Sequence, residues 1–283
     1  MIKSTKILDS KNITKENVLK VQSLTPKRKC FSTYSGIQDK KKNSKKSFSI
    51  SFIESIGPIF EAMTDLKLSY SNTFENYYLN IENEQELNKI KEWEERQGTR
   101  IFLRDTLSLS IALGLNLQEN HTHTDIGKLE NQAKHSQDLQ AIKNLTTLIQ
   151  DTISSLPFYK NADFICAIPP SPDKTFDLPS TLVSNISNNL NKLDITSNFR
   201  FHSSKSSIKE SSLDQKWDVW ESTGLYYDSA TGPNLKGKTI ILIDDKYQSG
   251  ITIQFVAMKL QQAGASAIYG LSIVKTLRDT DNL

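Results

Sequence analysis

The stretch from Thr239 to Val274 constrains the fold of this chain more than any other part of its sequence. It opens with an apolar run, Thr239 to Ile243, that is typical of a buried strand. A helix is expected from about Ile251 to Ala263, and a second apolar run, Ala267 to Val274, follows it. A strand, a helix and a strand with unbroken apolar strands predict parallel pairing covered on both faces. The sequence therefore predicts an α/β fold.

The loop between this strand and this helix carries the groups suited to chemistry. Asp244 and Asp245 follow the strand, and Gly250 precedes the helix. Ligands of open parallel sheets bind beyond the carboxyl ends of the strands, and a helix N-terminus favours a phosphate. The hydroxyls of Ser249 and Thr252 can donate to phosphate oxygens, whereas the two acids suit the hydroxyls of a nearby sugar. The alternative is an Asp-rich turn whose carboxylates are only solvated.

The residues from Ile240 to Thr252 resemble the phosphoribosyl pyrophosphate signature of type I phosphoribosyltransferases. That signature is an apolar strand, Asp-Asp, three residues, Thr or Ser, Gly, any residue and Thr. The chain is most similar to the ComF-type (competence protein F-like) branch, strongly in residues 235–275 and more weakly from residue 124 onward. The supporting stretches are Leu235 to Lys238, Leu260 to Gly270, Ala167 to Ser171, Thr124 to Gly127 and Ala133-Lys134. One departure is Lys246, which stands where the family usually has an apolar residue.

This resemblance implies a Rossmann-like, parallel-sheet phosphoribosyltransferase domain over residues 160–283. It implies a glycosyltransferase that binds phosphoribosyl pyrophosphate (PRPP) with Mg²⁺ and transfers phosphoribose to an acceptor. Asp244 and Asp245 would be the catalytic pair, and no residue is assigned directly to the metal. The residues implied to bind PRPP are Lys246, Tyr247, Gln248, Ser249, Gly250, Ile251, Thr252, Pro170 and Ser171.

A Ser- and Lys-rich segment from about Ser203 to Asp218 is the candidate for a mobile loop that closes over the donor. Lys205 and Lys209 would reach the pyrophosphate from it, unless they belong to an ordinary solvated loop. The nearby Trp217 and Trp220 could stack on a base, but we expect them to pack in the core, where large aromatics dominate buried contacts.

Upstream of the α/β domain we expect a basic flexible arm over residues 1–48 and a mainly helical region over residues 49–159. Residues 1–47 carry a net charge of +10, against −7 for the remainder. Such an arm attracts phosphates, so it either contacts DNA or RNA or has no ligand. The helical region would supply the hood that recognises the acceptor. Residues 101–117 fit both a helix and a strand, and we favour a helix.

The composition limits the other possibilities. No apolar stretch reaches the roughly 18 residues that span a bilayer, and the N-terminus has no apolar core of a secretory signal. We expect a cytoplasmic protein without membrane contact. An oligomer or a complex with a protein partner is compatible with the sequence. Cys30 and Cys166 are too few for a zinc ribbon or a disulfide framework. Two alternatives to the enzyme stay open: a module that senses PRPP or a nucleotide without turnover, and an effector of a defence (antiviral) or toxin system that contacts nucleic acid.

Overall fold

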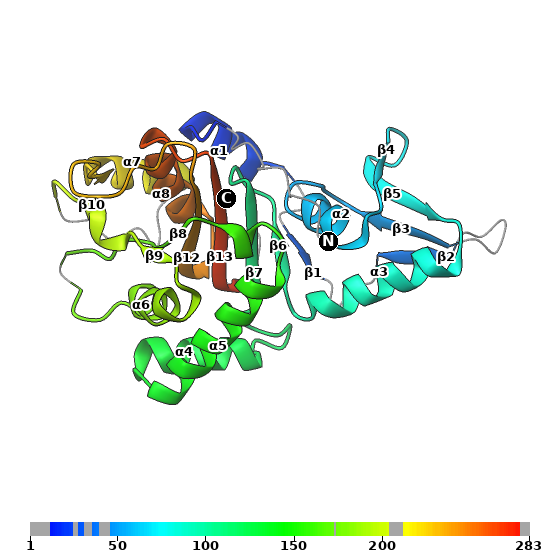
Figure 1. Ribbon diagram of the computed structural model, residues 1–283, viewed down its shortest axis with the longest axis horizontal. Helices are drawn as coiled ribbons and strands as arrows, with labels where there is room; N and C mark the ends of the chain where they lie inside the picture. Colours follow the sequence, from blue (N-terminus) through cyan, green and yellow to red (C-terminus); the bar gives the residue numbers. More distant parts are fainter. Residues whose placement is uncertain are drawn as a thin grey trace.

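A seven-stranded mixed sheet forms the centre of the protein (Figure 1). The computed structural model describes residues 12–24, 28–30, 36–39, 46–172, 174–203 and 212–277. In spatial order the strands are β1 (Arg28–Cys30), β6 (Ile101–Leu103), β7 (Leu109–Leu115), β13 (Ala267–Lys275), β12 (Thr239–Tyr247), β8 (Phe164–Ala167) and β9 (Leu193–Asp194). Neighbours from β7 to β9 are parallel, whereas β1 and β6 pair antiparallel at one edge. The expected α/β class, with mostly parallel strands, is confirmed.

Helices cover both faces of this sheet. One apolar core lies under α4 (Asp125–His135), α5 (Leu139–Ser155) and α6 (Leu178–Leu190). A second core on the opposite face lies under α1 (Lys15–Gln22), α7 (Leu213–Ser222) and α8 (Ile251–Gln262). The result is a three-layer arrangement compatible with a Rossmann-like fold (Figure 1).

The connections leave the two central strands in opposite directions. From β8 the chain passes through α6 to β9, and from β12 it passes through α8 to β13, on the other face. Two parallel neighbours whose connections diverge in this way define a switch point, where open α/β sheets form their ligand crevice. The carboxyl ends of β8 and β12 are therefore the first place to look for a site.

A smaller antiparallel sheet forms a lobe beside the main one, on the right in Figure 1. Its order is β2 (Ile37–Asp39), β3 (Lys46–Ile50), β5 (Asn76–Ile81) and β4 (Ser69–Ser71). Helices α2 (Ile56–Thr64) and α3 (Glu84–Gln97) pack on it through Phe48, Phe60 and Trp93, whose rings lie 4.8 to 5.9 Å apart. The remaining elements are the pair β10 (Phe199–Arg200) and β11 (Tyr226–Tyr227), and two 3₁₀ turns at Tyr159–Asn161 and Thr196–Asn198.

The described parts of residues 1–48 differ from the expected flexible arm. Helix α1 packs on α7, because Ile13 and Val18 are buried in the core shared with that helix. Lys15 forms ion pairs with Asp214 and Asp218, at 3.1 and 2.6 Å. Residues 1–11 and the lysine-rich segment 40–45 lie outside the described residues.

Two further expectations need correction. Residues 101–117 form β6 and β7 rather than a helix, and β7 pairs with β13 inside the main sheet. This strand is buried on both faces, so the apolar positions that fitted a helix, such as Ile111, are equally compatible with a strand. The region 49–159 thus contributes four helices and four strands among its described residues.

The second correction concerns β12, which continues through Asp244 and Asp245 to Tyr247 instead of ending at Ile243. Its partner β8 stops at Ala167, opposite Ile243, but β13 pairs with β12 as far as Lys275. The acids therefore stand on a strand that is paired on one side only.

No helix within the described ranges combines the length and apolarity needed to cross a bilayer.

Candidate ligand-binding site

The carboxyl ends of β8 and β12 lie side by side and bring two candidate loops together. The N–H of Ile168 donates to the Ile243 carbonyl at 2.9 Å, which continues the pairing one residue past β8. Pro170 and Ser171 follow in the loop and are half-buried. The structure therefore places the predicted loop after β8 beside the strand that carries the acidic pair.

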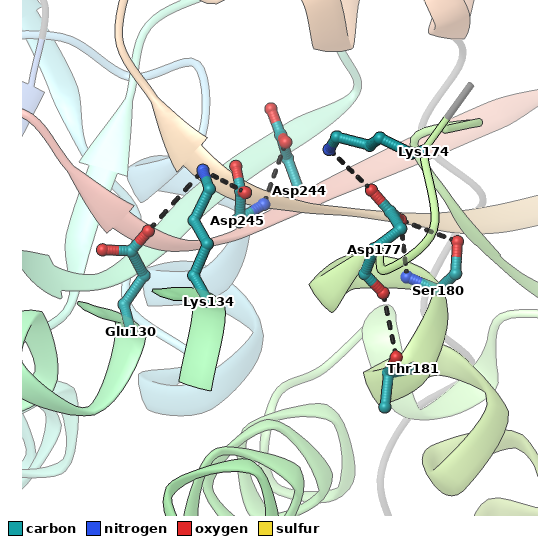
Figure 2. Close-up of polar contacts among 8 residues, drawn as sticks. All are labelled: Glu130, Lys134, Lys174, Asp177, Ser180, Thr181, Asp244 and Asp245. Atoms are coloured by element: carbon teal, nitrogen blue, oxygen red, sulfur yellow. Dashed lines mark hydrogen bonds and ion pairs between the residues drawn. The ribbon is translucent and has the colours of Figure 1, made fainter. Parts of the chain in front are cut away.

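The two acids have different surroundings. Asp244 is 8 % exposed, and its Oδ1 accepts a hydrogen bond from the Asp245 N–H at 2.9 Å. Asp245 is 14 % exposed at its side chain, and its Oδ2 lies 2.5 Å from Nζ of Lys134 on α4 (Figure 2). One carboxyl is thus enclosed, whereas the other is ion-paired and more exposed.

These surroundings raise the pKa of both Asp244 and Lys134, which disfavours the charged form of the acid and favours the charged form of the lysine. Burial, and next the negative charge of Asp245, raise the pKa of Asp244 well above the usual range of a carboxyl; Lys134 counters this in part. Burial by itself lowers the pKa of Lys134, but the charge and hydrogen bond of Asp245, together with the charges of Glu130 and Asp244, outweigh it, and the net pKa is raised. Lys134 is therefore held as a cation next to an acid that resists ionisation.

A buried glutamate continues this network on α4. Glu130 is 1 % exposed, with Oε1 at 3.9 Å from Lys134 Nζ and Oε2 at 3.5 Å from Lys246 Nζ. Lys246, which departs from the apolar residue usual at its position, thus turns toward α4. The cluster holds three acids and two lysines, which balance in charge when Asp244 is neutral.

A second lysine–carboxylate pair borders the acidic pair from the side of α6 (Figure 2). Lys174 Nζ lies 3.0 Å from Asp177 Oδ1, and Asp177 caps α6 by accepting from the N–H and hydroxyl of Ser180. The charge of Asp177 also contributes to the raised pKa of Asp244, so the two carboxyls repel each other electrostatically. Lysines therefore lie on two sides of the acidic pair, Lys134 on α4 and Lys174 before α6.

The turn from β12 into α8 has the geometry expected of an anion site. Gly250 takes φ +75° as the N-cap of α8, with no side-chain cap on that helix end. Ser249 is buried and its hydroxyl accepts from the Ile251 N–H at 3.4 Å, whereas Gln248 is exposed. The Thr252 hydroxyl accepts from Trp220 Nε1 at 3.2 Å. The turn thus offers backbone N–H groups at a helix start, where anions bind.

Two predicted binding residues face inward, away from this turn. Ile251 is 1 % exposed and Tyr247 is 4 % exposed. The Tyr247 hydroxyl donates to Asp105 Oδ2 at 3.2 Å. These residues can contribute only their backbone to a ligand, and their side chains fix the turn from behind.

The buried side-chain amide of Gln254, on α8, links the same turn to Thr106 of the upstream region. Gln254 Nε2 donates to the Gly250 carbonyl at 3.1 Å, and its Oε1 accepts from the N–H and hydroxyl of Thr106 at 3.0 and 2.8 Å. Gln254 and Thr106 are both at most 1 % exposed. The segment between β6 and β7 therefore supports the start of α8.

The other candidates have mixed outcomes. Lys205 and Lys209 lie outside the described residues, and α7 begins at Leu213, inside the expected loop. Trp217 and Trp220 are buried against Phe255 of α8, as expected of core residues.

Sequence reasoning missed several groups that border the site. Glu130, Lys174, Asp177 and Gln254 belong to segments outside the predicted loop, and no local pattern marked them. Lys134 lay in the stretch Ala133-Lys134, which resembles the ComF-type branch, so that resemblance was the one available signal.

No family model matches this sequence, and no curated protein is significantly similar to it. The class that the structure defines is an α/β fold with a mostly parallel sheet and a cluster of charged side chains at its switch point.

Proposed function

We propose that this protein binds PRPP at the carboxyl ends of β8 and β12 and transfers its phosphoribosyl group to an acceptor. The observation that supports this most is one juxtaposition. Three residues separate the acids Asp244 and Asp245 from Ser249-Gly250, which opens α8 at the switch point. In this proposal the helix start holds the 5-phosphate and the acids hold the ribose hydroxyls of one ligand.

Each group has a role in this proposal. Backbone N–H groups from Gln248 to Thr252 bind the 5-phosphate, and Asp244 and Asp245 accept from the ribose hydroxyls. The loop with Pro170 and Ser171 borders the pyrophosphate. As the bond from the anomeric carbon to pyrophosphate breaks, positive charge develops on the ribose, and the acids stabilise it. Preorganised charge of this kind is often the largest catalytic contribution, with about 10²–10³ in rate for one group.

Magnesium suits the carboxyl oxygens of Asp244 and Asp245, because it prefers oxygen ligands and keeps several waters. The described part of the chain gathers no group of three or more His, Cys, Asp or Glu that could hold a metal. An ion at Asp244 and Asp245 would therefore take most of its ligands from the donor and from water. When bound, it neutralises charge on the leaving pyrophosphate.

Titration calorimetry with PRPP and Mg²⁺ tests the proposal. The wild type is expected to bind, and Asp244→Asn with Asp245→Asn to bind at least about tenfold more weakly, since hydrogen bonds to charged groups contribute roughly 1.5–3 kcal/mol each. A matched control is Asp125→Asn with Asp151→Asn, two exposed acids on α4 and α5. Equal affinity for all three proteins would refute the assignment of the acids. No binding by the wild type would refute the proposal as a whole.

Nucleic-acid contact by the basic segment is a second candidate, favoured by the +10 charge of residues 1–47. Truncation is a poor test, because it removes the buried Ile13 and Val18. Replacing Lys40, Lys41, Lys42 and Lys45 with Gln is better. If these lysines bind phosphates, the variant loses affinity for single-stranded DNA or RNA, and its salt dependence becomes shallower by about 0.7 per lost contact. An unchanged slope rejects this segment.

A further inference from the structure

Lys134 is the side chain through which helix α4 touches the acidic pair. Its Nζ lies 2.5 Å from Asp245 Oδ2, and its side chain is 31 % exposed (Figure 2). Glu130, one turn earlier on the same helix, lies 3.9 Å away on the other side of the ammonium. Lys134 therefore has a fixed place between one acid of the site and one acid of its own helix.

The helix that carries Lys134 is anchored at the same edge of the sheet. Thr124 caps α4 by accepting from the Gly127 N–H at 2.9 Å, and it donates to the Leu115 carbonyl at the end of β7. Gly127 packs so closely on the backbone of Asn116 that a Cβ there would overlap it. The start of α4 is thus fixed to the carboxyl end of β7.

We propose that Lys134 is a positioning residue that holds the Asp245 side chain turned toward α4, so that Asp244 and Asp245 together present oxygens to the two hydroxyls of a ribose. This inference rests on the proposed function and names the feature of the ligand that is recognised, the vicinal diol. Lys134 acts through Asp245 and does not touch the sugar.

The physical reason is the orientation of the Asp245 carboxyl. The ammonium 2.5 Å from Oδ2 holds that oxygen against α4 and leaves the other oxygen as an acceptor for a hydroxyl. Without the ammonium, the side chain is free to turn. The acceptor geometry for a second hydroxyl is then lost.

Among the described residues, the two other lysines near Asp245 pair with different acids. Lys246 Nζ ion-pairs with Glu130, and Lys174 Nζ with Asp177. Removing the Lys134 ammonium therefore leaves Asp245 without its 2.5 Å partner, whereas the turn at Gly250 that would take the phosphate is unchanged.

The test compares ribose 5-phosphate with 2-deoxyribose 5-phosphate, which lacks one of the two hydroxyls. Affinities of both are measured by calorimetry for the wild type, Lys134→Met and Lys134→Arg, with inorganic phosphate as the probe of the turn alone. Lys128→Met is the matched control, because Lys128 lies on the same helix and pairs only loosely, at 3.9 Å, with the solvated Asp125.

The wild type and Lys128→Met are expected to prefer ribose 5-phosphate by roughly tenfold or more, the effect of one hydrogen bond to a charged group. In Lys134→Met the two affinities become nearly equal, while phosphate binds as before. Lys134→Arg restores the preference, since a guanidinium also pairs with a carboxylate. A change in folding alone would weaken all three probes together.

Two results would overturn the inference, and they are distinguishable. If Lys134→Met keeps the full preference of the wild type, Lys134 does not position Asp245, although the proposed donor site stands. If the wild type binds neither sugar phosphate, or binds both equally, the proposed function fails and the inference fails with it.

Discussion

The predicted phosphate turn requires a glycine at position 250. The substitution Gly250→Ala places a Cβ on a residue at φ +75°, and that Cβ would overlap the hydroxyl and ring of Tyr247. Gly237, which precedes β12 at its opposite end, has φ +74°, and a Cβ there would meet no atom within 4 Å. Gly237→Ala therefore carries the same backbone strain without the overlap.

The expected costs follow from these two environments. The left-handed backbone costs an alanine about 1–2 kcal/mol at either position. At position 250 the overlap adds roughly 1–3 kcal/mol, because overpacking displaces buried groups. Tyr247 is 4 % exposed and its hydroxyl donates to buried Asp105, so it cannot swing into solvent without breaking that buried hydrogen bond. We expect a total of about 2–5 kcal/mol for Gly250→Ala, against about 1–2 kcal/mol for Gly237→Ala.

Urea unfolding measures both costs, with the slope of the transition as a check that the unfolded state is unchanged. In a thermal scan each kcal/mol corresponds to a shift in Tm of roughly 2–4 °C for a chain of this size. Gly250→Ala should also lose PRPP binding, whereas Gly237→Ala should retain it. If Gly250→Ala is no more destabilised than Gly237→Ala, the turn does not pack on Tyr247 as described, and the reasoning fails.

Two further predictions concern the groups around this turn. Burial, and next its acidic neighbour, raise the pKa of Asp244, so ionising Asp244 opposes folding as the pH rises from the unfolded value of about 4. Asp244→Asn should therefore unfold at a higher temperature than the wild type at pH 8, lose that advantage near pH 4, and still bind PRPP more weakly than the wild type; a lower Tm at pH 8 would contradict the burial argument. Gln254→Leu leaves the groups of Thr106 and the Gly250 carbonyl without their buried partner and should cost about 2–4 kcal/mol in urea unfolding. Gln140→Leu on the exposed face of α5 is its control, and equal costs would argue against the buried amide.

The sequence predicted the parts of this molecule that depend on local pattern. Helix α8 begins at Ile251 as expected, because Gly250 ends the loop and the apolar residues then recur at helical spacing. The end of β12 was not predictable in the same way. Whether Asp244 and Asp245 belong to a strand depends on how far β13 extends beside them, and that is set by the packing of a separate segment.

Dependence on the packing of distant segments also explains why the sequence did not predict the N-terminal segment or the charged cluster around Asp245. A stretch with few large apolar residues suggested a free arm, but Ile13 and Val18 are enough to hold α1 on a core that α7 and α8 already form. Lys134 and Glu130 are ordinary charged residues of an amphipathic helix in the sequence. They become part of the site only because α4 starts at the carboxyl end of β7 and brings them over β12.

The segment between β6 and β7 links the upstream region to the predicted phosphate turn. Asp105 accepts from Tyr247, and Thr106 donates to Gln254, so this segment holds the turn on both sides of Gly250. The strand β7 that follows this segment pairs with β13 from Leu109 to Leu115. The upstream region therefore supports the turn directly, and if the turn binds a ligand as proposed, a ligand that orders it also favours the docked position of β6 and β7. Coupling of this kind is reciprocal, so we expect changes in the upstream lobe that loosen Asp105 or Thr106 to weaken the proposed binding at the turn by the same coupling free energy.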